Sequence, residues 1–247
     1  MLEIKGKWAL ITGASRGIGR LTAVELAKKG CNLILQARKA ENCRDISEEL
    51  KAFGIETRSV GAELSKPAEV EKMLAEIDEM GINVEIILNN AGIQVAYRNE
   101  FLTTPVSDFE TSFYVNTIAP MMICYHFLPK MSERGFGRIV NTTSGINLEP
   151  EQAGYSASKA ALDKVTRDLG SVYDGSDIIL SLADPGWCRT DLGGQHAPNA
   201  PESALPGVVV GVFVNDGKSG RLFTASDFHG MTLEEAVAKA EKMRGIY

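Results

Sequence analysis

Residues 8–19 read WALITGASRGIG, and this stretch decides the fold. The apolar run at residues 8–11 predicts a buried strand, and the apolar spacing after Gly19 is that of an amphipathic helix. Gly13, Gly17 and Gly19 lie between them, where glycine allows a tight turn and a close backbone approach to a ligand. A helix that begins at such a turn offers unpaired N–H groups and its positive dipole end to phosphates. The order of strand, glycine turn and helix therefore predicts dinucleotide binding rather than a plain loop of small residues.

The rest of the chain alternates between predicted strands and predicted helices. We expect strands at about 8–12, 32–37, 56–60, 84–89, 137–142, 177–183 and 221–225. We expect helices at about 17–29, 41–53, 67–80, 107–133, 155–173 and 202–214. This alternation predicts an α/β Rossmann fold, a doubly wound parallel sheet of about seven strands with helices on both faces. Right-handed crossovers place the carboxyl ends of the strands, and with them the site, along one edge.

Length and charge limit the organisation and the partners. The chain has 247 residues, which suits a single domain over residues 1–247. The net charge of −6 argues against nucleic acid or an anionic membrane as the main partner. Residues 1–7 have no apolar signal core and no stretch is long enough to span a bilayer, so the expected location is cytoplasmic. The four cysteines show no metal-ligand spacing, and no metal site is expected.

Two segments lie outside the alternating pattern. Residues 187–206 contain a Gly-Gly pair and three prolines, which predicts a loop or lid able to close over a substrate. Thr232 and Glu235 form a capping box, which predicts a helix to about Met243 within a C-terminal extension of about 226–247. The most economical role of this extension is packing, although it is also placed to cap a pocket or to contact a neighbouring subunit.

Tyr155 and Lys159 lie four residues apart in the run YSASKAA at residues 155–161. On a helix the two share one face, so the phenol and the ammonium can serve one site. A free tyrosine titrates at about pH 10, and a nearby cation lowers that pKa. The pair predicts a general acid/base for an alcohol or a carbonyl, with plain surface packing as the alternative for the pair alone.

The Gly-x-x-x-Gly-x-Gly turn and the Tyr-x-x-x-Lys pair together resemble the short-chain dehydrogenase/reductase family, over about residues 5–225. Other motifs of that family occur here in the same order. They are Asn-Asn-Ala-Gly at residues 89–92, Asn116, Ser144 after a predicted strand, and Asp184-Pro185-Gly186 with Thr190. Any one motif could arise by chance, whereas the full set in order is a strong signal.

The resemblance implies an NADP(H)-dependent oxidoreductase that interconverts a carbonyl and a secondary alcohol by hydride transfer. It implies that Tyr155 is the general acid/base and that Lys159 lowers its pKa and binds the nicotinamide ribose. Ser144 would hold the substrate oxygen, and Asn116 would anchor a water that relays protons to the lysine. Thr142 and Thr143 are neighbouring hydroxyls, but Ser144 is favoured because it follows the strand and precedes a glycine. The interval from Ser144 to Tyr155 is shorter than is common in the family, which should alter the pocket wall.

The cofactor site combines the glycine turn with positions that the resemblance supplies. Its expected residues are Gly13, Ser15, Arg16, Gly17, Ile18, Gly19, Arg38, Glu63, Leu64, Asn89, Ala91, Gly92, Tyr155, Lys159, Pro185, Gly186 and Thr190. Asn89, Ala91 and Gly92 are expected to form the wall beside the adenine ribose, and Asn90 to stabilise the central sheet. Ala37 occupies the usual acidic position and Arg38 follows it, while Arg16 lies in the glycine turn. Two guanidinium groups suit a 2′-phosphate, so NADP(H) is expected over NAD(H).

Two other functions stay open at this point. One is an epimerase or dehydratase of the same fold, and the other is a non-catalytic dinucleotide-sensing protein, which would be expected to lose the tyrosine or the lysine. The substrate is expected to be a small carbonyl or alcohol compound of unknown identity. The expected pocket residues, besides the 190s loop, are Gln94, Val95, Tyr97, Leu148 and Trp187. The resemblance also implies a homodimer or homotetramer formed through the helices at 107–133 and 155–173.

Overall fold

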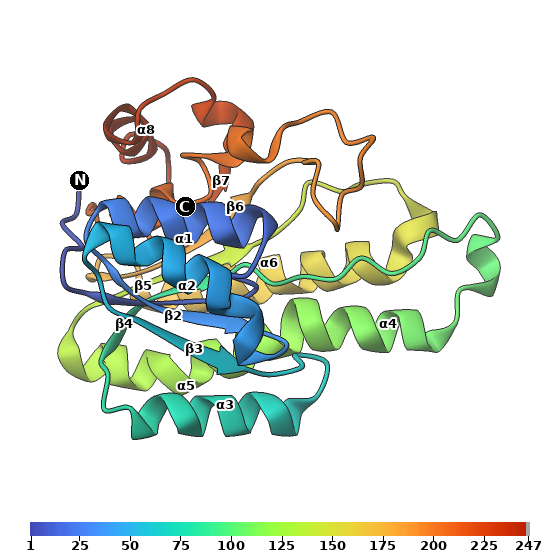
Figure 1. Cartoon of the computed structure of the whole chain (residues 1–247). Helices are drawn as coiled ribbons and strands as arrows, with labels where there is room; N and C mark the ends of the chain where they lie inside the picture. The colour runs from blue at the N-terminus through green and yellow to red at the C-terminus, as the bar shows by residue number, and fades with distance from the viewer. Residues whose placement is uncertain (246–247) are drawn as a thin grey trace.

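The strand that precedes the glycine turn lies inside a seven-stranded sheet in the computed structural model, which describes residues 1–245 (Figure 1). The strand order is β3 (Thr57–Gly61), β2 (Asn32–Ala37), β1 (Trp8–Ile11), β4 (Val84–Asn89), β5 (Gly137–Thr142), β6 (Ile178–Asp184) and β7 (Arg221–Thr224). Every neighbouring pair is parallel. The predicted doubly wound parallel sheet is confirmed, and its order reverses between β1 and β4, which is where such sheets bind ligands.

Alternating side chains of the central strands divide the core into two clusters. On β1, Ala9 and Ile11 belong to one cluster and Leu10 to the other. The first cluster is covered by α1 (Gly17–Lys28), α2 (Arg44–Leu50), α7 (Val210–Phe213) and α8 (Leu233–Ala240). The second is covered by α3 (Pro67–Glu79), α5 (Ala119–Arg134) and α6 (Ala153–Tyr173). Figure 1 shows α1 and α2 on one side of the sheet and α3 and α5 on the other, which agrees with strands buried on both faces.

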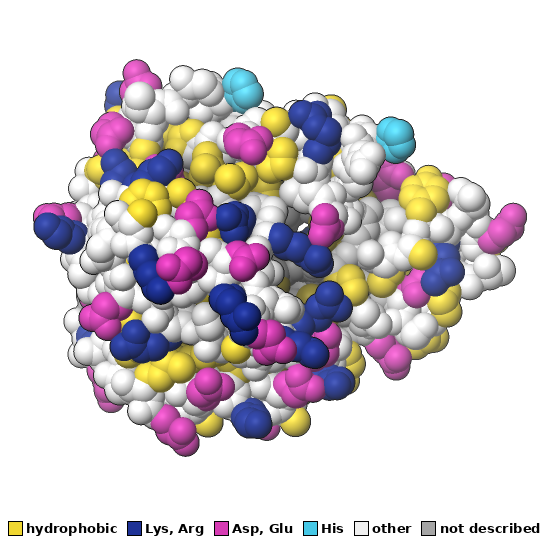
Figure 2. Space-filling view, viewed as in Figure 1, with side chains coloured by type: hydrophobic (Ala, Val, Ile, Leu, Met, Phe, Trp, Pro, Cys, Tyr) yellow, Lys and Arg dark blue, Asp and Glu magenta, His cyan; other side chains and the backbone are white. Residues whose placement is uncertain are grey.

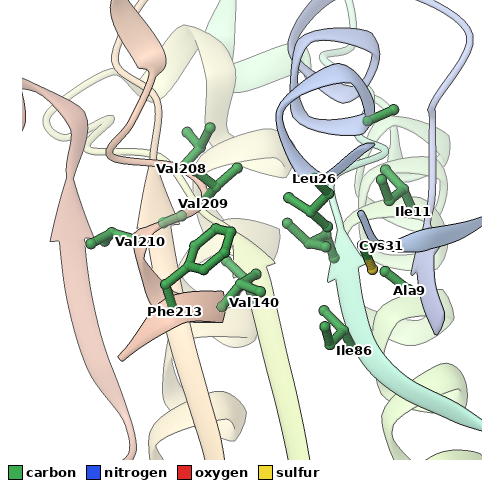
Figure 3. Close-up of a cluster of buried hydrophobic side chains, with 14 of the residues drawn as sticks. Ala9, Ile11, Leu26, Cys31, Ile86, Val140, Val208, Val209, Val210 and Phe213 are labelled. Atoms are coloured by element: carbon green, nitrogen blue, oxygen red, sulfur yellow. The ribbon is translucent and has the colours of Figure 1, made fainter. Parts of the chain in front are cut away.

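The first cluster joins segments far apart in the chain. Figure 3 shows Phe213 directed toward Val140 of β5, with Val208 and Val209 beside it and Leu26 of α1 facing them. Phe213 and Val209 are completely buried. The C-terminal part of the chain therefore completes the core above β5 and β6.

One predicted helix contains a local irregularity and another is interrupted. The helix predicted over 107–133 consists of α4 (Val106–Phe113), a π-helical turn at Tyr114–Ile118, and α5. The helix predicted over 202–214 is a 3₁₀ turn at Pro201–Ala204 followed only later by α7. Leu205 has an extended backbone with ψ at 146° because the following residue, Pro206, disfavours a helical conformation before it.

The helix predicted at 41–53 is also divided. It consists of a 3₁₀ turn at Ala40–Cys43, α2, and a second 3₁₀ turn at Lys51–Phe53.

The C-terminal helix begins at the predicted capping box. The Thr232 hydroxyl accepts a hydrogen bond from the Glu235 backbone N–H at 3.2 Å, and the Glu235 carboxylate accepts one from the Thr232 N–H at 2.9 Å. The helix ends at Ala240 rather than near Met243, and Lys218 Nζ donates to the Glu241 carbonyl at 2.8 Å just beyond it. The extension packs on the sheet layer; residues 246–247 of the predicted segment lie outside the described residues. No helix among residues 1–245 has both the length and the apolar character needed to cross a bilayer.

A glycine in the last turn of α6, Gly170, sets the distance between this helix and the sheet. A Cβ at Gly170 would lie 2.7 Å from the Cα and N of Gly220, just before β7. We expect Gly170→Ala to lower the free energy of unfolding by about 1–3 kcal/mol, because backbone atoms must separate to admit the methyl group. Urea denaturation measures this change.

The exposed neighbour on the same helix provides the control for this variant. Ser171→Ala should change the free energy of unfolding by less than about 0.5 kcal/mol. Helix propensity alone would make Gly170→Ala stabilising by about 1 kcal/mol, so a more stable variant would contradict the packing argument.

Candidate active site

A cleft of about 1740 Å³ runs along the carboxyl edge of the sheet. Its walls come from the glycine turn after β1, the ends of β2, β4, β5 and β6, and the loop after β6. This is the edge on which right-handed crossovers were predicted to place the site. Figure 2 shows the surface hollowed near the centre of the view, with basic and acidic side chains around the hollow.

The glycine turn packs against α1 too closely for any other residue at Gly19. A Cβ there would lie 2.2 Å from the Gly13 carbonyl oxygen and 2.5 Å from Asn90 Nδ2. Gly13 itself has φ at +65°, a conformation that favours glycine. The first turn of α1 has no side-chain cap and no acidic residue, so its N–H groups are open to an anion. This cradle fits the pyrophosphate of a dinucleotide.

Gln36, which the sequence analysis did not single out, holds the glycine turn in place. Its Oε1 accepts a hydrogen bond from Gly13 N at 3.1 Å, and its Nε2 donates to the Ala62 carbonyl at 3.0 Å. The residue is buried at the end of β2, where every neighbouring strand position is apolar or small. A buried amide in such a strand was the available signal, because it needs partners for each polar atom.

Of the two adjacent asparagines, Asn90 joins the ends of β1 and β4 as expected, whereas the side chain of Asn89 does not face the cleft. Asn90 lines the cleft, and its Nδ2 donates to the Thr12 carbonyl at 3.0 Å. Asn89 was predicted as a cofactor residue, but its side chain is buried in the sheet and donates to Asn141 Oδ1 at 2.8 Å. The prediction was wrong because successive residues of a strand point to opposite faces, and only one of the two can reach the cleft. Ala91 and Gly92 both line the cleft as expected.

The outer end of the cleft carries mixed charges. Arg38 lines it at the end of β2, next to the buried Ala37, and Leu64 contributes an apolar wall. The Glu63 carboxylate accepts hydrogen bonds from the backbone N–H and the hydroxyl of Ser65, at 3.3 and 3.2 Å. The Glu63 carboxylate therefore holds the local turn at residues 63–65.

Two carboxylates of this region were missed by the sequence analysis. Glu41 and Asp45 also line the cleft, at the start of the segment that follows β2. Acidic groups are thus present near Arg38 even though the usual position at Ala37 is not acidic.

The loop predicted at 187–206 is folded against the glycine turn. A Cβ at Gly17 would lie 3.4 Å from the Thr190 side chain, and Arg16 forms an ion pair with Asp191 at 2.8 Å. The loop is also fastened internally, because Trp187 Nε1 donates to the Gly193 carbonyl at 2.7 Å. Pro185, Gly186 and Thr190 line the cleft here, as do Ser15, Gly17 and Ile18 on the opposite side. The loop and the glycine turn therefore contact each other across one end of the cleft.

The four predicted catalytic residues come from three elements. Tyr155 and Lys159 lie on α6 and are only 7% and 4% exposed, and Ser144 lies in the loop after β5. Lys159 Nζ donates to the Thr142 carbonyl at 2.7 Å. A Cβ at Gly92 would lie 3.4 Å from Asn116 Oδ1 and 3.5 Å from Lys159 Nζ, so a small gap separates these two groups.

Asn116 owes its position to the π-helical turn. Its Nδ2 donates to the Ile93 carbonyl at 2.9 Å and to Ser158 Oγ at 3.0 Å, and its Oδ1 accepts from Ile93 N at 2.8 Å. The side chain therefore joins α6 to the loop after β4. Single π-helical turns inside helices are often found at functional sites, and this one lies within an otherwise continuous helical segment over residues 106–134.

Of the adjacent hydroxyls of Thr143 and Ser144, the one of Ser144 is not held by a carboxylate. The Thr143 hydroxyl donates to the Asp163 carboxylate, which lies one turn after Lys159 on α6. Ser144 Oγ accepts a backbone hydrogen bond from Ile146 N at 3.2 Å, its hydroxyl also acts on Tyr155, and the residue lines the cleft. The preference for Ser144 over Thr143 is consistent with this arrangement.

The acid–base properties of the pair differ from the prediction. Burial raises the pKa of Tyr155, the Ser144 hydroxyl opposes this effect, and the negative charge of Asp184 adds to it. The expected lowering by Lys159 is not found, because Nζ lies 6.0 Å from the centre of the tyrosine ring and bonds a carbonyl instead. Burial lowers the pKa of Lys159 to about 8, against the opposing charges of Asp163 and Asp184.

The expected substrate-pocket residues fall into two groups. Gln94, Tyr97 and Trp187 line the cleft. Val95 does not line the cleft, contrary to the prediction, and its carbonyl accepts a hydrogen bond from Gln152 Nε2 at 3.5 Å. Leu148 is 90% exposed with φ at +60°, so the prediction that it lines the pocket was wrong. The left-handed backbone at this residue turns its side chain out of the short loop that leads to α6.

Comparison with known proteins gives a consistent result. A family model described as short chain dehydrogenase matches residues 7–200. The chain is 30% identical over 195 residues to 3-oxoacyl-[acyl-carrier-protein] reductase FabG of Aquifex aeolicus, covering 77% of either chain. It is 31% identical over 210 residues to Hydroxynaphthalene reductase-like protein Arp2 of Metarhizium anisopliae, covering 83% of this chain and 77% of that one.

A solved structure agrees over nearly the whole chain. A metagenomic short-chain oxidoreductase in complex with NADP superposes with a TM-score of 0.76 at 26% identity, over 90% of this chain and 99% of that chain. The glycine cradle, the paired tyrosine and lysine and these similarities have one explanation. The chain belongs to the short-chain dehydrogenase/reductase family of oxidoreductases.

Proposed function

We propose that this protein is an NADP(H)-dependent oxidoreductase that interconverts a carbonyl and a secondary alcohol, with Tyr155 as the general acid/base. The observation that carries the proposal is the convergence of Tyr155, Ser144 and Lys159 on one cleft with the glycine cradle. The two relatives described above are named as reductases, which favours reduction as the direction.

A nicotinamide dinucleotide, when bound, would supply or accept the hydride. The first turn of α1 would hold its phosphates, and Lys159 would hold its ribose. The Ser144 hydroxyl would donate a hydrogen bond to the substrate oxygen and stabilise the charge that develops there. Tyr155 Oη would give its proton to that oxygen during reduction, or remove one during oxidation.

The raised pKa of Tyr155 keeps its proton in place at neutral pH, as an acid for reduction requires. Lys159, with a pKa of about 8, is close to the range in which it can also release and regain a proton. The gap beside Gly92, between Lys159 Nζ and Asn116 Oδ1, suits a water that would resupply the proton. In this proposal Asn116 positions that water and Lys159 passes the proton on.

The preference for NADP(H) rests on Arg38 and Arg16. Arg38 lies exposed at the end of β2 without an ion-pair partner among residues 1–245, and it is free to meet a 2′-phosphate. The metagenomic relative was solved with NADP. A homodimer or homotetramer and a cytoplasmic location remain further expectations for this protein.

Removing the phenol hydroxyl tests the acid–base role. We expect Tyr155→Phe to lower kcat for carbonyl reduction by about 10²–10⁴-fold, because the developing alkoxide loses its proton donor. NADPH binding, measured by fluorescence titration, should be unchanged. Tyr125→Phe, on the exposed side of α5, is the matched control and should keep full activity. An unchanged kcat in Tyr155→Phe would instead favour a dinucleotide sensor or another base.

The pH profile tests the charge on Lys159. Reduction requires the ammonium form, so kcat/KM should fall as the pH rises through about 8. Asp163 stabilises that ammonium, so Asp163→Asn should move the falling limb to lower pH. Stopped-flow or steady-state assays across the pH range measure both curves. A limb that stays in place would show that Lys159 does not limit the reaction.

The cofactor preference has its own test. Arg38→Ala should raise the KM for NADPH by about tenfold and leave the KM for NADH nearly unchanged, because only the phosphate contact is lost. Arg58→Ala, an exposed arginine of β3 outside the cleft lining, should change neither value. A native protein that turns over NADH faster than NADPH would overturn the argument from Arg16 and Arg38.

A further inference from the structure

Asp184, the last residue of β6, places a carboxylate inside the cleft. The residue is only 9% exposed and lines the cleft together with Tyr155 and Ser144. Its Oδ1 accepts a hydrogen bond from Gly186 N at 2.9 Å, which fixes the turn after the strand. Among residues 1–245, no donor bonds Oδ2 and no cation pairs with it. One oxygen of a nine-tenths buried carboxylate is therefore left without a partner.

The unpartnered oxygen points at the residue that follows Ser144. A Cβ built on Gly145 would lie 2.8 Å from Asp184 Oδ2. Only a glycine at this position leaves room for the carboxylate. Oδ2 thus lies beside the loop that carries the proposed substrate-binding hydroxyl, and its charge also acts on Tyr155 and Lys159.

A second carboxylate near Lys159 makes a useful comparison. Asp163 also acts electrostatically on Lys159, but its side chain is engaged by the Thr143 hydroxyl and does not line the cleft. Two carboxylates thus surround one ammonium, and only Asp184 can touch a molecule in the cleft. Because Asp184 Oδ2 has no hydrogen-bond donor among residues 1–245, a ligand that brings an ammonium or a hydroxyl would form a charge-assisted hydrogen bond there.

We infer that Asp184 Oδ2 forms a substrate subsite for a hydrogen-bond donor, an ammonium or a hydroxyl on the carbon next to the reacting carbonyl. The same oxygen disfavours a carboxylate there through like-charge repulsion. This inference rests on the proposed carbonyl reduction, because it places the donor relative to a carbonyl held by Ser144 and Tyr155. The alternative role of Asp184 is limited to the turn after β6, which uses only Oδ1.

A matched series of phenyl ketones tests the subsite. The compounds are 2-aminoacetophenone, 2-hydroxyacetophenone, 2-methoxyacetophenone and phenylglyoxylate, which share the phenyl ketone and differ in the adjacent group. Reduction with NADPH is followed at a pH well below the Lys159 pKa, so that Lys159 stays charged. We expect kcat/KM to fall in the order ammonium, hydroxyl, methoxy, carboxylate, with at least about a tenfold difference between ammonium and methoxy.

The variant Asp184→Asn separates the subsite from the turn. Asparagine can keep the bond from Gly186 N, but it replaces Oδ2 by an amide donor and removes the charge. The ratio of kcat/KM for the ammonium compound to that for the methoxy compound should fall at least about tenfold in this variant. The kcat/KM for phenylglyoxylate should rise. Asp163→Asn removes an equal charge near Lys159 outside the cleft lining, so it should preserve the order of the four ketones.

Binding measurements keep this inference distinct from the proposed function. The four ketones are titrated by calorimetry into native protein and into Asp184→Asn, both saturated with NADP⁺. Ketone turnover without any preference in the native protein would overturn the subsite and leave the reductase standing. If no ketone is reduced but 2-aminoacetophenone binds more tightly than the methoxy compound only with Asp184 present, the subsite stands and the reductase fails. A weaker Kd for NADPH in Asp184→Asn, with the order of ketones unchanged, would assign Asp184 to the cofactor and overturn the inference.

Discussion

The close approach of α1 to the turn after β1 is the contact on which the rest of the site depends. Gly19 of α1 touches the Gly13 carbonyl and Asn90, and any side chain at Gly19 would separate them. This contact links the glycine turn to the end of β4. Gln36 then links the same turn to β2 and to the end of β3, so four strand ends share one bonded framework. The glycine turn and the first turn of α1 are placed accurately on such a framework because neither relies on a long flexible loop.

The second organising feature is a single buried ammonium among oxygen atoms. Lys159 is held by the Thr142 carbonyl, faced by the charges of Asp163 and Asp184, and separated from Tyr155. Burial and the two carboxylates act in opposite directions on its pKa, and burial prevails. Burial also dominates at Tyr155, where it raises the pKa. In the free protein burial therefore raises the pKa of the phenol and lowers that of the ammonium.

Features that follow from periodicity or motif spacing were predicted from the sequence. Features that depend on the direction of one side chain were not. The β2, β4 and β5 bounds were predicted to the residue because apolar runs end where polar ones begin. The turn, Tyr155 and Lys159 followed from spacing that leaves little choice of geometry. The π-helical turn at Asn116, the buried side chain of Asn89 and the outward Leu148 could not be predicted in this way. Each of them depends on a shift of about one residue in the direction of a side chain, which periodicity does not resolve. The direction of the Tyr155 pKa shift was also predicted wrongly, because burial of the phenol is the dominant effect on it.

The ion pair between Arg16 and Asp191 makes the entrance of the cleft more exposed to solvent than its interior. Both side chains are about two-thirds exposed, so their attraction is weak and is screened by dissolved salt. The groups behind it, Tyr155 and Lys159, are almost fully shielded from solvent. Ionic strength therefore acts mainly on the ion pair at the cleft entrance, and through it on the rates at which a ligand enters and leaves the cleft. The buried side chains of Tyr155 and Lys159 are affected much less.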